Sequence, residues 1–527
     1  MFRVLVCDPV AEEGLNILRQ AGCDVLIKTN QNPDQLLGLV KDVDAIVVRS
    51  ETRMTSALIA AAPKLRIIGR AGVGVDNIDV PAATSAGVVV VNSPEGNTVA
   101  AAEHTFAMLL SLARHIPQAN QALREKRWDR KKYIGIQLYQ KTLGVVGLGK
   151  IGRRVAGYAR HFGMRVLAYD PFVPDDMMAD MKFEKADLDR IFLESDFITL
   201  HVPKTDETQN LVSAQTLSKM KPGCRIINCA RGGIIHEQDL LEAIERKHIA
   251  GAAIDVFDKE PNTESPLIFN PDVIATPHLG ASTEEAQVLV AMDVAADIVR
   301  MLHGEPAQNA VNLPLLRPEI VRPVAAYLKL SEKLGLFVSQ LFDEAATQVE
   351  VKYHGELATH DVSPLTLAFL KGFLTPHVGD RVNYVNASLI AKERGIALNE
   401  IRYEGPSDYV NLISVKAQGQ RQSHTAAGTK SAVFGETIVN VDGFKLNALC
   451  EGLLLVVPNR DVPGMVAKIA TYLGNKNINI AGMTVGRERI KGEARMILNV
   501  DDPVLKEDLD AIGRFENILG PLRQIKL

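Results

Sequence analysis

A glycine-rich turn between an expected strand and an expected helix constrains the fold of this chain more than any other feature of the sequence. Gly147, Gly149 and Gly152 are spaced as G-x-G-x-x-G directly after the apolar run 143–146. The residues after the turn include an apolar helical stripe: Ile151, Val155, Ala159 and Phe162. A second apolar run then ends at Asp170, 18 residues after Gly152. Strand, glycine turn, helix and acid-terminated strand in this order predict a βαβ unit that binds a dinucleotide, rather than a purely structural turn.

Each position of this motif has a physical reason. Gly147 permits the tight turn, Gly149 lets the backbone approach a pyrophosphate, and Gly152 lets the helix approach the strand. Lys150 and Ile151 begin the helix, whose unpaired N–H groups and dipole favour an anion. We predict that all five residues contact the cofactor.

Asp170 indicates which dinucleotide binds. Its carboxylate can accept hydrogen bonds from both ribose hydroxyls, and it repels a 2'-phosphate. The next residues, Pro171 and Phe172, offer no arginine to hold such a phosphate. The sequence therefore predicts NAD rather than NADP, with Asp255, at the end of a later strand, as a further cofactor contact.

A chain of 527 residues is too long for one hydrophobic core and predicts roughly three to four domains. Short apolar runs alternate with helical patterns in two series. The first series is 4–6, 45–48, 65–68 and 88–91, and the second is 143–146, 166–169, 197–200, 225–228, 252–256 and 273–275. This alternation predicts parallel sheets with helices on both faces. The fold class is therefore α/β, with two doubly wound, Rossmann-like domains.

The second half of the chain has a different pattern of apolar and polar residues. A helical stripe at 284–302 is expected to return to the first domain, and the proline-containing segment NAVNLPLLRPE is the expected linker. After a region of mixed patterns, the last 80 residues follow the order βαββαβ of a ferredoxin-like module. The predicted domains are 1–95 with 283–312 for substrate, 96–282 for NAD, an intervening α+β domain at 313–448, and the terminal module at 449–527.

Composition and charge exclude several functions. The formal net charge of -4 gives no general attraction to nucleic acid or anionic membrane. The longest apolar-looking stretch, 99–112, contains Glu103 and His104 and is shorter than the roughly 20 residues that cross a bilayer, so no membrane span is expected. Five widely spaced cysteines indicate neither a disulfide framework nor a metal cluster, and they favour a reduced, cytoplasmic location.

Polar residues at the ends of the second series of strands are candidates for chemistry, because ligands of open parallel sheets lie outside the carboxyl ends of the strands. Arg231 follows IINCA and precedes two glycines, and its guanidinium suits a carboxylate. His278 and Glu260 end neighbouring strand regions, and a histidine fixed by a carboxylate is a suitable base for a hydroxyl proton. Taken singly, Arg231 is also compatible with a surface turn and His278 with a structural role.

Several motifs resemble those of the D-isomer-specific 2-hydroxyacid dehydrogenases over nearly the whole chain. They are RSETRMT, GRAGVGVDNID, NSPEGNTVAAAEHT, GLGKIG, NCARGGII, DVFDKEP and PHLGAST, followed by a terminal module similar to an ACT domain. The resemblance implies that Arg231 binds the substrate carboxylate, His278 is the acid/base and Glu260 orients it.

Within that family the chain resembles the long, multi-domain members that act on 3-phosphoglycerate. Arg49 and Arg70 end strands of the first domain and, by this resemblance, take the phosphate with Asn97 nearby. The small-residue loop Gly72, Val73 and Gly74 has N–H groups that can meet a carboxylate. Arg130, in RWDRKKYIG, matches a basic stretch that in the family can reach a neighbouring subunit's site. Taken alone, these arginines are also compatible with surface charges.

The expected activity is the NAD-dependent oxidation of 3-phospho-D-glycerate to 3-phosphohydroxypyruvate, the first step toward L-serine, by a homodimer or homotetramer. Two alternatives stay open: an NAD-sensing binding protein on the same fold, and a dehydrogenase of another acid such as glycerate or lactate.

In the intervening region, 313–448, the sequence shows no group of residues that indicates catalysis. There His424, Lys430 and Arg421 fit either an anion site or a solvated basic face.

The terminal module is expected to bind L-serine as an inhibitor, because similar ACT domains bind amino acids, usually across a dimer interface. Asp461 suits an ammonium group, and Asn479 can donate and accept hydrogen bonds. The two side chains are expected to face a ligand between strand and helix or between two paired modules. A plain dimerisation module without ligand is the alternative.

Overall fold

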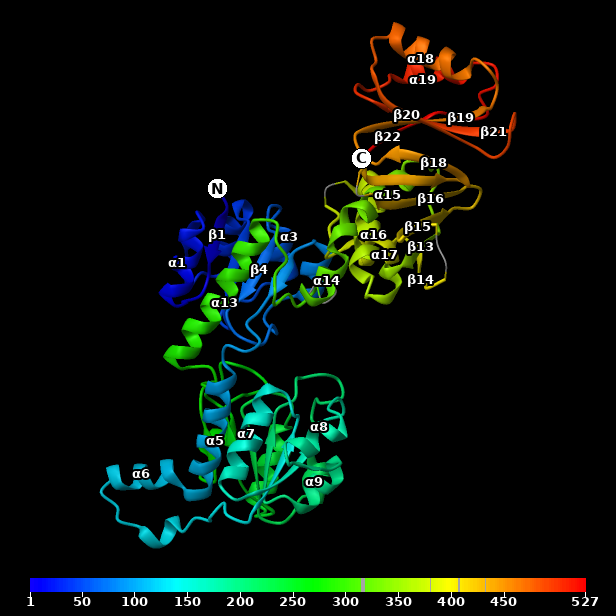
Figure 1. The fold of residues 1–527 in the computed structure, drawn as a ribbon. Coiled ribbons are helices and arrows are strands. Elements are labelled where there is room, and N and C mark those ends of the chain that lie inside the picture. Colours follow the sequence, from blue (N-terminus) through cyan, green and yellow to red (C-terminus); the bar gives the residue numbers. More distant parts are fainter. Residues whose placement is uncertain (314–317, 380, 406–407, 432) are drawn as a thin grey trace.

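The computed structural model describes residues 1–313, 318–379, 381–405, 408–431 and 433–527. The predicted linker NAVNLPLLRPE therefore lies partly outside the described residues. Figure 1 shows two α/β domains in the first part of the chain, with the intervening domain and the terminal module following on another side of the first domain.

The N-terminal sheet consists of parallel strands in the order β2-β1-β3-β4-β5. These strands are β1 (Arg3–Val6), β2 (Asp24–Ile27), β3 (Ala45–Val48), β4 (Ile67–Arg70) and β5 (Val89–Val91). The helices between them are α1 (Glu12–Gln20), α2 (Pro33–Leu39), α3 (Ser56–Ala60) and α4 (Val80–Ser85). As predicted, the later helix α13 (Glu284–Leu302) returns here, where Val294 and Ile298 join the core against α1 and β4.

The second sheet is also parallel, in the order β12-β11-β10-β9-β6-β7-β8. Its strands are β6 (Thr142–Val146), β7 (Arg165–Tyr169), β8 (Glu184–Lys185), β9 (Phe197–Leu200), β10 (Cys224–Asn228), β11 (Ile249–Ile254) and β12 (Val273–Ala275). Its helices are α5 (Thr98–Arg114), α6 (Ile116–Arg124), α7 (Lys150–His161), α8 (Asp175–Asp180), α9 (Leu188–Glu194), α10 (Ala214–Lys219), α11 (Glu237–Glu245) and α12 (Pro266–Phe269). Because β6 lies between β7 and β9, the strand order reverses at β6, where ligands of such sheets bind. The predicted pair of Rossmann-like domains is confirmed.

The intervening domain is built on a mixed sheet in the order β14-β13-β15-β16-β17-β18. Its strands are β13 (Gln348–Gly355), β14 (Ala397–Tyr403), β15 (Asn411–Gln418), β16 (Ser423–Ser431), β17 (Gly435–Val441) and β18 (Phe444–Leu449). Its helices are α14 (Pro318–Val324), α15 (Leu328–Ser339), α16 (Ser363–Val378) and α17 (Ala387–Glu393). This domain docks on the first one, because Asn383 donates a 2.7 Å hydrogen bond to the Gly87 carbonyl and Val385 joins the core of the N-terminal domain.

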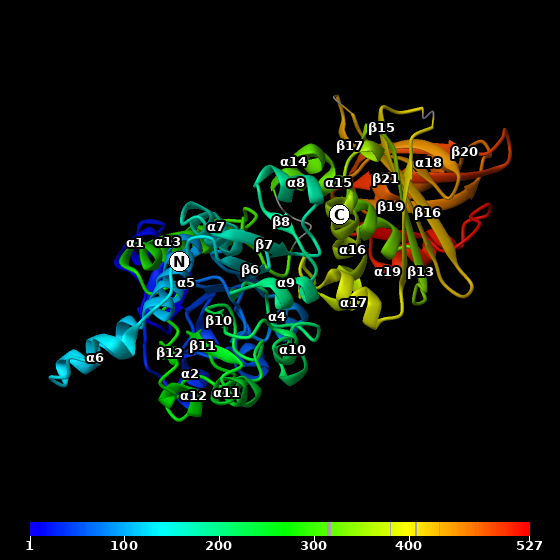
Figure 2. The same ribbon diagram turned by 90° about the horizontal axis from the view of Figure 1, so that it is seen from below.

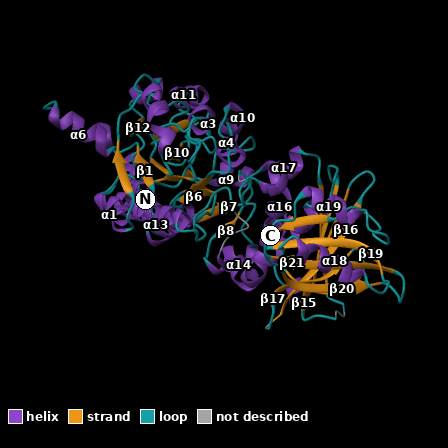
Figure 3. Cartoon of the chain, turned by 90° about the horizontal axis from the view of Figure 1, so that it is seen from above, coloured by secondary structure: helices purple, strands orange, loops and turns teal. Residues whose placement is uncertain are grey.

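The terminal module has the predicted order βαββαβ, with sheet order β20-β21-β19-β22. Its elements are β19 (Leu453–Arg460), α18 (Met465–Asn475), β20 (Ile480–Arg487), β21 (Glu493–Val500), α19 (Lys506–Gly513) and β22 (Arg523–Lys526). One face of this sheet packs under α18 and α19, and the other contributes to the core of the intervening domain. The strands of these two C-terminal sheets lie close to one another in Figure 3, with β18 beside β20 and β21.

Helix α6 projects from the second domain in both Figure 1 and Figure 2. Among the described residues, no helix combines the length and the apolar character that crossing a bilayer requires.

Candidate active site

The glycine turn after β6 has the geometry that its motif predicts. Gly147 has φ +95°, and a Cβ atom there would lie 2.5 Å from the His201 carbonyl oxygen. A Cβ atom at Gly152 would lie 2.0 Å from the Gly147 carbonyl oxygen, so neither position tolerates a side chain. A Cβ atom at Gly149 would meet no atom within 4 Å. Gly147 and Gly152 are therefore packed against backbone, whereas Gly149 is open. At Gly149 the N-terminus of α7 can receive an anion.

Asp170 lies at the end of β7 and is held by backbone donors. Its Oδ2 accepts a 2.8 Å hydrogen bond from the Leu148 N–H, and its Oδ1 accepts one of 2.9 Å from the Phe172 N–H. Asp170 and Phe172 line a pocket of about 690 Å³ that extends to Lys185 on β8. Size and position fit the adenosine half of NAD, since the pocket adjoins the open turn. Sequence reasoning missed Lys185, because nothing in its local sequence indicates that β8 reaches this pocket.

Lys150, the first residue of α7, forms an ion pair with Glu95, in the segment that enters α5. Asn97 lies at the N-terminus of α5, and its buried Oδ1 has no hydrogen-bond partner among the described residues. Asn97, and Lys150 through its contact with Glu95, therefore lie at the segment by which the chain passes from the first α/β domain to the second. Asn97 retains an acceptor for a ligand group.

His278 and Glu260 lie together as predicted. The His278 Nδ1 is 2.7 Å from the Glu260 Oε2, and the other oxygen of Glu260 accepts a 2.9 Å hydrogen bond from the Phe257 N–H. Burial acts to raise the pKa of Glu260, but the hydrogen bonds from His278 and Phe257 outweigh it and hold that pKa below its usual value. The carboxylate therefore stays charged and orients the imidazole, while the His278 Nε2 has no partner among the described residues.

Asp255 organises the loop that carries His278. It is fully buried, and its carboxylate accepts hydrogen bonds from the Thr276 hydroxyl at 2.6 Å and from the N–H groups of Leu279 and Gly280 at 2.7 and 2.9 Å. Its carbonyl oxygen accepts a 2.9 Å bond from the His278 N–H. A direct contact of Asp255 with the cofactor stays a prediction; its observed contacts position the loop.

His104 of α5 is a site residue that sequence reasoning missed. Its Nε2 is 3.2 Å from the Asp255 Oδ1 and 3.3 Å from the Thr276 Oγ1. Burial acts to raise the pKa of Asp255, but hydrogen bonds from His104 and Thr276 outweigh it and keep that pKa below its usual value. The polar pair Glu103 and His104 inside an apolar helical stretch was the available signal.

Three groups of kinds that can ligate a metal lie close together beside the loop of His278. Ligand atoms of His104, Cys229 and Asp255 lie within 4.8 Å of one another. Burial raises the pKa of the Cys229 thiol to about 12. The hydrogen bond between His104 and Asp255 accounts for the cluster without an ion.

Arg231 reaches from the second α/β domain to a residue of the first. Its Nε donates a 3.0 Å hydrogen bond to the Oδ2 of Asp76, and its Nη1 donates one of 2.7 Å to the Ala230 carbonyl. A Cβ atom at Gly74 would lie 2.1 Å from the Arg231 Nη2, so glycine is needed beneath the guanidinium. Sequence reasoning missed Asp76, although it lies in the motif GVGVDNID.

The first domain contributes two more arginines beside the 72–74 loop. Arg70 is largely buried, its Nε has no partner among the described residues, and a Cβ atom at Gly72 would lie 1.6 Å from its Nη1. Burial, and then the charges of Arg231 and Arg49, lower the pKa of Arg70 to about 10. The backbone of Arg49 is fixed by the buried carboxylate of Asp8, which accepts a 2.5 Å bond from the Arg49 N–H.

The structure thus brings together three guanidinium groups, a buried unpaired N–H donor and a small-residue loop. Cationic groups that lower each other's affinity for protons are a feature of anion-binding sites. The loop, with Val73 at its centre, lies between Arg70 and Arg231. This cluster of residues is therefore suited to an anionic ligand.

Arg130 and the two predicted effector residues lie outside this cluster. Arg130 is exposed in the segment after α6, the helix that projects from the second domain (Figure 2). Asp461 accepts hydrogen bonds from Arg487 and the Lys491 N–H, whereas Asn479 donates a 2.7 Å bond to Asp501.

The register of the terminal sheet separates Asp461 from Asn479. Asp461 follows Arg460, which lies opposite Glu493, whereas Asn479 precedes Ile480, which lies opposite Val500. Seven strand residues separate these positions, or about 24 Å. The idea that one ligand bridges both side chains within a single module is therefore wrong, because they lie at opposite ends of the sheet.

Three family models match the chain. The NAD binding domain of D-isomer specific 2-hydroxyacid dehydrogenases matches residues 106–280, the D-3-phosphoglycerate dehydrogenase intervening domain matches 323–442, and the ACT domain matches 454–517. A D-3-phosphoglycerate dehydrogenase from Synechocystis sp. is 50% identical over 96% of this chain and 91% of its own length. The chain belongs to the D-3-phosphoglycerate dehydrogenase family.

Further comparisons agree with this family. The Bacillus subtilis D-3-phosphoglycerate dehydrogenase is 44% identical over 96% of this chain and 97% of its own length. Among solved structures, D-lactate dehydrogenase from Aquifex aeolicus, complexed with NAD and lactic acid, is 27% identical with a TM-score of 0.53, and the match covers 59% of this chain and 98% of that one. NAD is the cofactor of this family's nucleotide-binding domain, in agreement with the fit of the turn and of Asp170.

Proposed function

We propose that this chain oxidises 3-phospho-D-glycerate to 3-phosphohydroxypyruvate with NAD⁺, the first step toward L-serine. Two observations support the proposal: Arg49 and Arg231 lie close enough to Arg70 to lower its pKa, and Arg231, Glu260 and His278 follow the neighbouring parallel strands β10, β11 and β12, with His278 bonded to Glu260. A substrate with a phosphate at one end and a carboxylate at the other matches this arrangement.

Each residue of the proposed site has its own role in binding or catalysis. Arg231 and the N–H groups of the 72–74 loop hold the carboxylate, and Arg49 and Arg70 hold the phosphate. His278 takes the C2 hydroxyl proton at Nε2, and the Glu260 carboxylate stabilises the resulting imidazolium. NAD⁺, which the turn after β6 and Asp170 would hold, would supply the acceptor for the hydride of C2. The C–H and O–H bonds of C2 are thereby replaced by a carbonyl.

A steady-state assay of NADH formation tests this function. With 3-phosphoglycerate, D-glycerate and D-lactate side by side, kcat/KM should be highest for 3-phosphoglycerate. A preference for glycerate or lactate would favour the alternative dehydrogenase activity. Binding of NAD without turnover of any of the three acids would favour a sensing protein.

Regulation and assembly form a second part of the proposal. The ACT domain supports control by a small ligand, for which we take L-serine, and the separation of Asp461 from Asn479 requires two modules if both contact one molecule. A cytoplasmic homodimer or homotetramer meets that requirement, and Arg130 on the projecting segment is then placed to approach a neighbouring subunit.

Two experiments test this part of the proposal. Light scattering gives the oligomeric state. Loss of serine inhibition in both Asp461→Ala and Asn479→Ala would support the shared site, and unchanged inhibition in both would reject it.

A further inference from the structure

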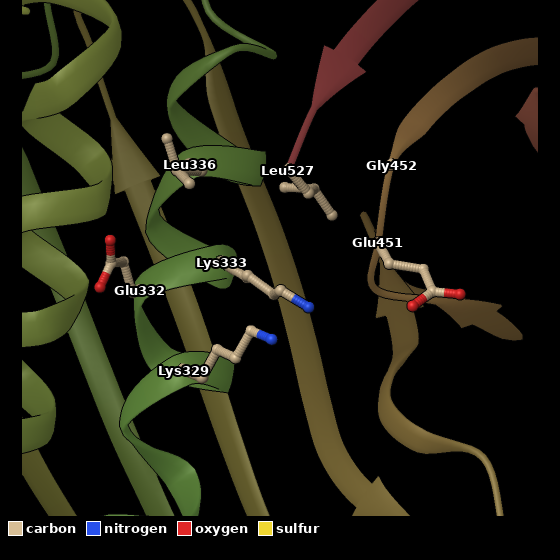
Figure 4. A pocket seen from close by; sticks show the side chains of 7 residues that line it. All are labelled: Lys329, Glu332, Lys333, Leu336, Glu451, Gly452 and Leu527. Carbon is tan, nitrogen blue, oxygen red and sulfur yellow. The ribbon is translucent and has the colours of Figure 1, made fainter. Parts of the chain in front are cut away.

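A second pocket lies between α15 and the segment 451–452, which joins the intervening domain to the terminal module (Figure 4). Its volume is about 470 Å³, within the range of small-molecule sites. None of its lining residues belongs to the candidate active site or to the predicted serine site.

Two lysines from successive turns of α15 form its cationic wall. Lys333 is mostly buried, and its ammonium donates to the Glu436 Oε2 at 2.7 Å and to the Cys450 carbonyl at 2.5 Å. Lys329 is exposed and has no hydrogen bond or ion pair among the described residues. Figure 4 shows both side chains extending from the helix into the gap. The wall therefore carries one uncompensated positive charge beside a fixed ammonium group.

The opposite wall carries a negative charge. Glu451 lies across the gap from the lysines (Figure 4), and its carboxylate has no partner in the described part of the chain. Leu336, on α15 like the lysines, and Leu527 also line the pocket. The pocket thus offers a positive end, a negative end and an apolar surface.

We propose that this pocket binds a free α-amino acid with an apolar side chain. Its carboxylate pairs with Lys329 and the remaining N–H of Lys333, its ammonium pairs with Glu451, and its side chain packs on Leu336 and Leu527. A simple anion would meet Glu451 as a like charge, and a simple cation would meet Lys329. The site goes beyond the proposed function and is separate from the serine site of the terminal module.

Helix α15 connects this pocket to the substrate-binding domain. Glu332 turns to the other side of the helix (Figure 4), where it accepts hydrogen bonds from Lys371 at 2.7 Å and from the Tyr384 hydroxyl at 3.2 Å. The residue before Tyr384, Asn383, bonds the Gly87 carbonyl of the first domain. A ligand that shifts α15 therefore acts on an element that contacts the substrate domain.

Calorimetry on the full-length chain tests the binding, with L-leucine as the probe. Two analogues, 4-methylpentanoate and 3-methylbutylamine, each lack one charged group. We expect saturable binding of L-leucine and weakening by about tenfold or more in Lys329→Gln and in Glu451→Gln, since each loses one charged contact. Lys416→Gln, an exposed lysine on β15, is the matched control and should bind as the unchanged chain does.

Three results would overturn the proposal: no heat of binding at 10 mM L-leucine, equal affinity of 4-methylpentanoate and L-leucine, or affinity unchanged in both pocket variants. The first two would mean that the pocket is no amino-acid site, and the third would place the ligand elsewhere. A shift of the KM for 3-phosphoglycerate by L-leucine, lost in Tyr384→Phe while binding persists, would confirm the connection through α15. Binding without any kinetic effect would overturn that connection.

Discussion

At the scale of single residues, Arg70 shows how a conflict between burial and charge marks a binding site. A guanidinium loses hydration on burial, and this one has an unpartnered Nε and two like charges, Arg49 and Arg231, close enough to lower its pKa. Such an arrangement costs stability unless an anion completes it. We therefore expect an anionic ligand at Arg70.

The first prediction concerns the phosphate. Arg49→Ala or Arg70→Ala should reduce kcat/KM for 3-phosphoglycerate by about 10- to 100-fold, since a charge-assisted contact is worth about 1.5–3 kcal/mol. Glycerate, which has no phosphate, should lose far less. Parallel assays of both acids measure the difference, with Arg300→Ala on α13 as the control. Equal losses for the two acids would place the phosphate elsewhere.

The second prediction concerns the base. His278→Asn should lower kcat by about 10²- to 10⁴-fold, because the hydroxyl proton then has no acceptor, while NAD binding persists. In Glu260→Gln the imidazolium loses its negative partner and is less favoured. Glu260→Gln should therefore lower kcat as well. Near-normal turnover of the asparagine variant would remove His278 from the mechanism.

At the scale of elements, the turn from β6 into α7 and the loop after β12 depend on two different aspartates. Asp170 fixes the Leu148 N–H of the turn, and Asp255 fixes three donors of the catalytic loop. Each carboxylate therefore fixes the loop after one strand to the end of the neighbouring strand.

The third prediction concerns cofactor choice. Asp170→Ala should weaken NAD binding and narrow its advantage over NADP, because the ribose hydrogen bonds and the repulsion of a 2'-phosphate both disappear. Lys185, on the same pocket, is a cation that remains near the vacated position. Fluorescence titration with NADH and NADPH gives both dissociation constants. An unchanged ratio would mean that another residue distinguishes the two cofactors.

The fourth prediction concerns His104 as a positioning residue. His104→Leu leaves the buried Asp255 without one donor and should lower kcat for 3-phosphoglycerate with little change in KM, because the loop of His278 loosens. His104→Gln keeps a donor and should recover part of the rate. Steady-state kinetics of both variants decide the question. The same rate in the leucine and glutamine variants would show that the hydrogen bond is unimportant.

Much of the fold could be predicted because buried parallel strands appear as apolar runs, such as 143–146 and 225–228, each followed by a helical stripe. The exact ends of the strands were harder to predict. For example, the run expected at 65–68 is observed as a strand at Ile67–Arg70. The exposed strand β14 and the two-residue strand β8 carry no comparable apolar signal.

The candidate site was predictable where a motif fixes residues within one element. The turn glycines, Asp170 and the strand-end residues Arg231 and His278 are of this kind. The contacts of Asp76 with Arg231 and of His104 with Asp255 join residues 155 and 151 positions apart, and only the folded chain brings them together. For the same reason, the distance between Asp461 and Asn479 could not be judged before the sheet register was known.

At the scale of the whole molecule, the terminal module is part of the intervening domain's core rather than an appended unit. Leu454, Val456 and Ile497 are almost fully buried in the same cluster as Val349 and Phe369. Gln340, after α15, also exchanges hydrogen bonds with the backbone of Lys526 on β22. Removal of the module would therefore expose an apolar face of the intervening domain.

The fifth prediction follows from this shared core. A chain that ends after Cys450 loses the contacts of Leu454, Val456, Ile497 and Ile525, and burial of each such side chain is worth about 1.5–3 kcal/mol. The intervening domain should then melt at a lower temperature and bind a hydrophobic dye, while the NAD-binding domain keeps its affinity for NADH. Calorimetric melting, dye fluorescence and NADH titration measure the three effects. Lys416→Gln, on the exposed side of β15, leaves the shared core intact; it is the control and should melt as the unchanged chain does. If the truncated chain melts like the full one and binds no dye, the two domains are energetically independent, and loss of serine inhibition in it would then report on the module alone.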